Sequence, residues 1–162
     1  MRTPRWFLLT ACVAALVATT ASAAFAGTTK RFPIAGAYSG TASTQVDGNT
    51  ATVVAKGAGK ATTLGSGKIT GNGTADTSQQ PCTPFGGTGT LTGAGSVITF
   101  RVPTTSSGCG DEGGHVFAIK GVFQVVKVTG KLAKAKGSLR FSGTYSHDDG
   151  TFSIKLTGSL TK

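Results

Sequence analysis

Hydrophobic and polar positions alternate along the last part of the chain. The clearest case is the range 151–160, where four apolar residues occupy one face of an extended segment: Phe152, Ile154, Leu156 and Leu160. Residues 139–145 alternate in the same way, and Asp149-Gly150 between the two segments is typical of a tight hairpin turn. A period of two predicts β-strands with one buried face. The C-terminal region is therefore predicted to be a β-hairpin.

Weaker patterns of the same period predict six further strands. Residues 98–102 alternate, and 115–126 is apolar on both faces, so we expect it to be the most buried strand. The N-terminal half is built from Thr, Ala and Gly and predicts strands at 37–46, 50–60, 66–75 and 87–93. Eight short strands without a helical pattern are typical of a sandwich or a closed barrel. We predict an all-β protein, an eight-stranded antiparallel up-and-down β-barrel.

The order of the strands predicts which connections share an end of this barrel. The connections after the first, third, fifth and seventh strands, near 47–49, 76–86, 103–114 and 147–150, would lie at one rim. They contain all six acidic residues: Asp47, Asp76, Asp111, Glu112, Asp148 and Asp149. They also contain Cys82 and Cys109, which we predict to form a disulfide. The opposite rim would receive the lysine-rich connection 127–136.

Composition agrees with this architecture. The 25 glycines follow no collagen-like period, and only 14% of the 162 residues are charged, which argues against a disordered chain. Glycine also lowers helix propensity, whereas closely coiled barrel strands require it. The formal net charge is +10.

The N-terminal residues have the layout of a secretory signal peptide, with two arginines, an apolar run and small residues. We predict a signal peptide helix at 1–26, an N-terminal extension at 27–36 and the β-barrel domain at 37–162. Cleavage after Ala23 is an alternative to cleavage after Ala26, and a lipoprotein box ending at Cys12 is a third. No later segment is apolar enough to span a bilayer as a helix. The mature protein is thus expected to be secreted to the extracellular space, with a net charge of +8 after the loss of Arg2 and Arg5.

A resemblance adds to these predictions. The residues concerned are Thr129-Gly130-Lys131-Leu132-Ala133-Lys134-Ala135-Lys136-Gly137-Ser138-Leu139 and the two strands that follow them. This region resembles the C-terminal half of the allene oxide cyclase and dirigent-like barrels. Bacterial secreted members of that group are the most similar. The resemblance implies a calycin-like barrel in which the glycine allows a tight turn and Leu and Ala pack under the barrel. None of the plant enzymes' catalytic residues can be matched here, so their activities are not implied.

Two clusters suggest chemistry beyond the fold. Asp111, Glu112 and His115 are candidate metal ligands, with calcium the best-matched ion, although Asp and Gly also serve simply to make turns. Four lysines are candidate contacts with an anionic cell-envelope polymer: Lys127, Lys131, Lys134 and Lys136. No aromatic residue is interleaved among them for base stacking, so nucleic acid is not predicted. No phosphate loop or nucleophile elbow is present, and we predict no cofactor and no catalytic residue.

These observations favour a non-enzymatic barrel that binds a small apolar or amphipathic ligand. The expected lining residues are aromatic: Phe100, Phe117, Phe123, Phe141, Tyr145 and Phe152. Because small barrels often fill their interior with side chains, an interior that holds no ligand is the competing prediction. A cyclase or isomerase that uses the acidic rim and an envelope-associated structural protein are the further alternatives. Whether the interior is open separates the ligand-binding and enzymatic hypotheses from the structural one.

Overall fold

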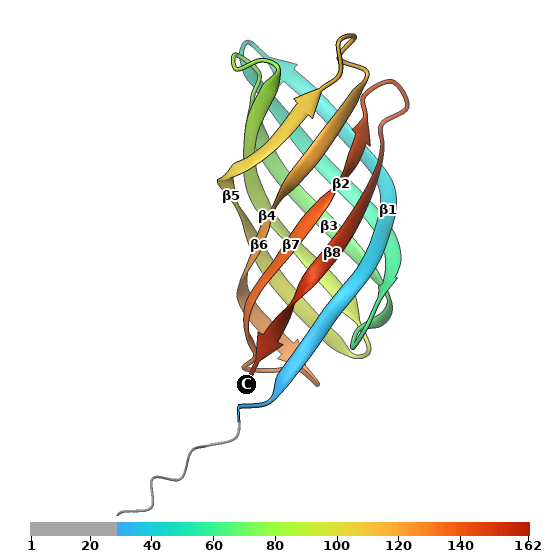
Figure 1. Cartoon of the computed structure of the whole chain (residues 1–162), viewed down its shortest axis with the longest axis vertical. Helices are drawn as coiled ribbons and strands as arrows, with labels where there is room; N and C mark the ends of the chain where they lie inside the picture. The colour runs from blue at the N-terminus through green and yellow to red at the C-terminus, as the bar shows by residue number, and fades with distance from the viewer. Residues whose placement is uncertain (1–28) are drawn as a thin grey trace, which may run out of the picture.

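The computed structural model describes residues 29–162, so the predicted signal peptide and its cleavage sites lie outside the described residues. Eight antiparallel strands form a closed barrel in which each strand pairs with the next along the chain and the first pairs with the last (Figure 1). The strands are β1 (Arg31–Asp47), β2 (Thr50–Ala61), β3 (Gly65–Asp76), β4 (Cys82–Gly93), β5 (Ser96–Gly110), β6 (Val116–Gly130), β7 (Lys136–Ser146) and β8 (Thr151–Thr161). The predicted up-and-down barrel is confirmed. None of the residues from 29 onward forms a helix long and apolar enough to cross a membrane.

Several strands are longer than the sequence pattern predicts. β1 begins at Arg31, inside the range 27–36 that was expected to be an extension. β4 begins at Cys82 rather than near 87, and β5 continues to Gly110 rather than ending near 102. The predicted connections 76–86 and 103–114 are therefore too long. In these segments Pro, Ser, Thr and Gly are typical of loops, yet their backbone is extended, and most of it outside the irregular stretch 102–106 pairs with neighbouring strands.

The prediction that 115–126 is the most buried strand is wrong. In β6, Phe117 and Ile119 point inward and are half-buried, whereas Val116 and Val126 on the other face are exposed. Valine on the outside of a barrel strand reflects the preference of β-branched residues for extended backbone rather than burial. An apolar pattern on both faces therefore does not by itself indicate a second buried face.

The end of the barrel where β1 begins and β8 ends, at the bottom of Figure 1, is filled with buried apolar side chains. We call it the closed end. Its core contains apolar residues from strands and turns together: Ile34, Tyr38, Ala61, Leu64, Leu91, Ile98, Val128, Leu132, Ala135, Leu139, Leu156 and Leu160. Next to this core, Lys30 before β1 and Lys162 after β8 are joined by two backbone hydrogen bonds of 2.9 Å.

The segment that carries the family resemblance forms the turn at this closed end. Gly130 has a φ of 76°, a conformation that glycine adopts without strain, and the chain then reverses between β6 and β7. Leu132 and Ala135 in the turn are buried under the barrel. The Leu132 amide donates a hydrogen bond of 3.1 Å to the Ser96 hydroxyl. The predicted roles of glycine, leucine and alanine in this segment are confirmed.

Candidate ligand-binding cavity

The other half of the barrel interior is not filled and contains a cavity of about 340 Å³. The cavity extends to the end formed by the connections β1–β2, β3–β4, β5–β6 and β7–β8, at the top of Figure 1, because Val46, Gln80 and His147 at that end belong to its lining. We call this end the mouth. Small-molecule sites range from about 300 to 1,000 Å³, so the cavity lies at the small end of that range.

All six aromatic residues that the sequence predicts as lining are found around this cavity: Phe100, Phe117, Phe123, Phe141, Tyr145 and Phe152. Three of them pack in a row. The ring centroids of Phe100 and Phe123 are 4.0 Å apart in a stacked arrangement, and those of Phe123 and Phe141 are 4.6 Å apart. Phe117 and Tyr145 lie closer to the mouth, with centroids 6.3 Å apart. The alternation that identified them places them on the inner face of the strands.

Glycines on neighbouring strands make room for these rings. A Cβ built on Gly89 would lie 2.6 Å from the Phe100 ring, and one built on Gly121 would lie 2.7 Å from the Phe141 ring. Each of these glycines is the direct cross-strand partner of the phenylalanine it faces. Inward-facing glycine therefore lets an aromatic ring lie against the wall of the barrel.

Several lining residues were not predicted. Phe85 lies in the lining, and its ring is 6.2 Å from that of Phe141, but it falls within the predicted connection 76–86. Its alternation with Thr83 and Gly87 is the signal that could have identified it. The remaining wall on β1–β3 consists of small apolar residues, among them Ala42, Val53 and Ala55. They share a period of two with the aromatic positions, but small side chains give a weak pattern.

Few polar groups face the cavity. The hydroxyls of Thr44 and Tyr145 form a hydrogen bond of 2.9 Å with each other across the interior. The hydroxyl of Thr83 donates to the carbonyl of Gln79 in the β3–β4 connection at 3.2 Å. Neither Lys, Arg, Asp nor Glu is among the lining residues of this cavity. The interior is thus mainly apolar, and the hydroxyls of Thr44, Thr83 and Tyr145 already have partners.

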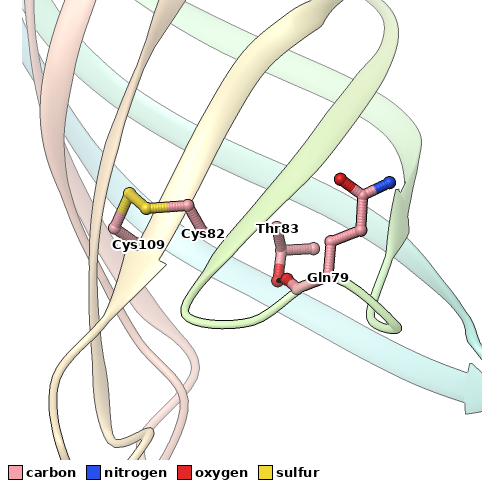
Figure 2. Close-up of a disulfide and its surroundings, with 4 residues drawn as sticks. All are labelled: Gln79, Cys82, Thr83 and Cys109. Carbon is pink, nitrogen blue, oxygen red and sulfur yellow. Dashed lines mark hydrogen bonds between the residues drawn. A yellow bond between two sulfur atoms is a disulfide. The ribbon is translucent and has the colours of Figure 1, made fainter.

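The predicted disulfide is present beside the mouth. Cys82 at the start of β4 is the cross-strand partner of Cys109 near the end of β5, and their sulfur atoms are bonded. Figure 2 shows the bridge together with Gln79 of the β3–β4 connection and Thr83 of β4. The pairing of β5 with its neighbours is irregular between Arg101 and Ser107, so the bridge joins β4 to β5 just beyond a bulged segment.

All six acidic residues lie at the mouth, as predicted. Two of them accept hydrogen bonds from residues two positions further along their own loops. The Asp76 carboxylate accepts hydrogen bonds from the Ser78 amide and hydroxyl, and Asp149 accepts from the Thr151 amide and hydroxyl. The hydrogen bonds from Ser78 to Asp76 and from Thr151 to Asp149 lower the pKa of each carboxyl group below its ordinary value.

Two mouth connections are also linked by an ion pair. The Nδ1 atom of His115 in the β5–β6 connection lies 3.0 Å from both carboxylate oxygens of Asp148 in the β7–β8 connection. Hydrogen bonding and charge from Asp148 raise the pKa of His115. The His115 amide in turn donates to Asp111 at 2.8 Å, which is the main cause of the lowered pKa of that carboxyl group.

The structure does not assemble the predicted metal ligands. Asp111 binds the backbone of His115, while the imidazole of His115 faces Asp148 instead of Asp111 or Glu112. Among residues 29–162, no group of three or more His, Cys, Asp or Glu side chains is arranged to hold a metal ion. These acidic residues instead make turns, which was the alternative interpretation of the sequence.

The predicted lysine cluster lies at the closed end. Lys131 and Lys134 are in the β6–β7 turn, Lys127 precedes it on β6, and Lys136 begins β7. The four lysines are therefore brought together at the end opposite the acidic residues. Their contact with an anionic polymer remains a prediction.

Comparison with known proteins gives no identification. No protein-family model, no curated protein and no solved structure matches this chain significantly. The closed eight-stranded barrel agrees with the fold that the resemblance implied, but membership in the allene oxide cyclase and dirigent-like group is not identified.

Proposed function

We propose that this protein binds a small apolar or amphipathic molecule in the mouth half of its barrel. The observation that carries the proposal is the contrast between the two halves of one interior. The closed end is packed with aliphatic side chains, whereas the mouth end leaves about 340 Å³ lined by aromatic rings and small residues. An open apolar cavity exposes apolar surface to water, which is unfavourable. A ligand bound in the cavity would cover that surface.

The wall of the cavity supports the same proposal. Larger side chains at Ala42, Ala55 or Ala75 would fill the space at no cost in backbone conformation, since each faces inward from a regular strand. Small residues on one side and stacked rings on the other give a shaped, apolar compartment. Each methylene group that such a compartment removes from water contributes about 0.8 kcal/mol, so a chain of about ten methylenes supplies roughly the 8 kcal/mol of micromolar binding before the costs of association are subtracted.

A pair of variants on the same strand tests the proposal. Ala55→Phe places a ring in the cavity, while Ala58→Phe places the same ring on the outer face of β2, where residue 58 is exposed. We expect titration calorimetry with decanol to show binding to the wild type and to Ala58→Phe. Binding to Ala55→Phe should be weaker by about tenfold or more, equivalent to 1.4 kcal/mol.

Circular dichroism and a cooperative thermal transition establish that both variants fold. Equal decanol affinity in the two folded variants would contradict binding in the cavity, as would a wild type that binds no apolar molecule. Cyclase or isomerase activity, secretion and attachment to an anionic envelope polymer remain predictions of the sequence.

A further inference from the structure

The distribution of charge around the mouth defines the ligand more narrowly. We propose that the cavity selects an amphiphile with a cationic head, whose apolar body lies against the aromatic rings and whose positive group remains at the acidic mouth. This inference rests on the proposed function and names the chemical class of its ligand. The cavity is the site, and the charges at its entrance determine which amphiphiles enter it.

The first argument is the sign of the charge at the entrance. Six carboxylates lie in or next to the mouth connections, which contain no Lys or Arg; their basic side chains are His147 and His115, and His115 is paired with Asp148. This holds although residues 27–162 carry a net charge of +8. Like charges in a local cluster raise the concentration of the opposite ion near the entrance and repel ions of their own sign. A cation is therefore attracted to the mouth of a protein that repels cations elsewhere.

The second argument is what the interior lacks. A carboxylate, phosphate or sulfate head needs a positively charged or hydrogen-bond-donating partner when it leaves water. The cavity lining contains no Lys or Arg, the Tyr145 and Thr44 hydroxyls already bind each other, and the side chains of Gln80 and His147 belong to the lining only at the mouth. An anionic amphiphile would thus bring its head close to carboxylates without a Lys or Arg partner. The structure disfavours the anionic class and leaves neutral and cationic ligands.

The third argument separates cationic from neutral ligands. Phe117 and Tyr145 are cross-strand partners near the mouth, and the ring of His147 lies 6.5 Å from that of Tyr145. The faces of Phe and Tyr rings attract alkylammonium groups, with about 0.5–1 kcal/mol at exposed sites. Hydrogen bonds to Asp76, Asp111 and Asp149 also keep these carboxylates ionised at neutral pH. Rings and carboxylates together favour a positive head over a neutral one.

Three probes with the same alkyl chain and different heads test the inference: decyltrimethylammonium, decanol and decanoate, each below its micelle concentration. We expect decyltrimethylammonium to bind the wild type at least about tenfold more tightly than decanoate at low salt, with decanol between them. The difference should narrow at high salt, because exposed charges are screened within about 3 Å at 1 M ionic strength.

Charge variants assign the selectivity to the mouth. Asp47→Asn combined with Glu112→Gln removes two charges and leaves the loop hydrogen bonds of Asp76, Asp111 and Asp149 in place. We expect the ratio of ammonium to decanoate affinity to fall by about threefold or more, with the decanol affinity unchanged. The matched control, Lys134→Gln with Lys136→Gln at the closed end, should leave the ratio within about twofold of wild type.

The outcomes distinguish ligand binding in the cavity from selectivity for a cationic head. If decanol binds but the three heads bind equally, or decanoate binds most tightly, the cationic selectivity is wrong while cavity binding stands. If none of the probes binds, both proposals fail. If the ammonium preference is present but unchanged in the Asp47 and Glu112 variant, the preference does not come from the mouth charges and the inference is overturned.

Discussion

At the scale of single residues, two tyrosines on the inner face of the barrel meet different environments. Tyr145 lies near the mouth, and its hydroxyl is bonded to Thr44. Tyr38 lies in the closed end with 1% of its surface exposed, and within residues 29–162 its hydroxyl has no hydrogen-bond partner. Burial raises the pKa of the Tyr38 phenol. The hydroxyl group of Tyr145 is thus expected to raise the free energy of unfolding, and that of Tyr38 to lower it.

Phenylalanine substitutions test this contrast. Tyr38→Phe removes a buried hydroxyl that binds nothing, so we expect the free energy of unfolding to rise by roughly 1 kcal/mol. Tyr145→Phe leaves Thr44 without its partner and should lower the free energy of unfolding by about 1 kcal/mol. Urea denaturation measures both. A Tyr38→Phe protein as destabilised as Tyr145→Phe would mean that the Tyr38 hydroxyl has a partner after all.

At the scale of elements, the disulfide joins β4 and β5 where the backbone pairing of the barrel is least regular. β5 shifts register against β4 near Phe85 and against β6 between Arg101 and Ser107. Cys82 and Cys109 pair directly, on the mouth side of these shifts. The bridge therefore holds the mouth wall at a position where ladder hydrogen bonds are interrupted.

Removal of the bridge should be costly. Cys82→Ser with Cys109→Ser frees a loop of 27 residues, and loop-closure entropy then predicts a loss of about 3–4 kcal/mol in the free energy of unfolding. Denaturant titration measures the loss. Dithiothreitol should shift the wild-type midpoint and leave that of the double variant unchanged. A double variant whose midpoint equals that of the oxidised wild type would show that the bridge does not constrain the unfolded chain.

The elements also show what sequence patterns can and cannot predict. The inward face was predictable where a large residue recurs at every second position, as in 151–160. In 115–126, which is apolar on both faces, Phe117 and Phe123 were named as lining because they are aromatic. The extended segment 103–110 was missed, because Pro103, Thr104, Thr105 and Ser107 carry no apolar period. The disulfide followed from topology, since alternate connections share a rim. The ion pair between His115 and Asp148 was not predictable, because it depends on loop conformations that no local pattern specifies.

At the scale of the whole molecule, the two ends of the barrel differ in charge and in packing. The closed end carries the lysine-rich turn and a filled core, while the mouth carries the acidic residues and the cavity. The shifted pKa values other than that of Tyr38 belong to mouth residues: Asp76, Asp111, His115 and Asp149. Among residues 29–162, the mouth should therefore respond to pH through its carboxylates and His115.

The direction of that response follows from the signs of the shifts. Lowered carboxyl pKa values stabilise the loops above their ordinary value of 3.8, and this contribution is lost as the pH falls through the lower folded values. The raised pKa of His115 stabilises the folded mouth below 6.5 and is lost as the pH rises through the higher folded value. Amide-exchange protection at 111–116 and 147–151 should be greatest between these limits.

Asp148→Asn provides the control for this pH dependence. It removes the partner of His115, so the loss of protection at higher pH should disappear, while the loss at lower pH persists through Asp76, Asp111 and Asp149. Amides in β8 near Leu156 serve as the internal reference, since they lie in the filled half. Protection at the mouth that does not vary with pH would contradict the assigned role of these groups.

The pairing of β1 with β8 has a consequence for how the protein is made. Eleven residue pairs, from Arg31 with Thr161 to Thr41 with Thr151, join the two strands that are farthest apart along the chain. Before β8 has left the ribosome, β1 and β7 are unpaired edges of an open sheet. Such a sheet cannot close, and its edges can pair with other chains. The barrel is completed only after the last strand emerges, so synthesis and final folding are separate in time. A chaperone that covers the edges of β1 and β7 during that interval would raise the yield of the closed form.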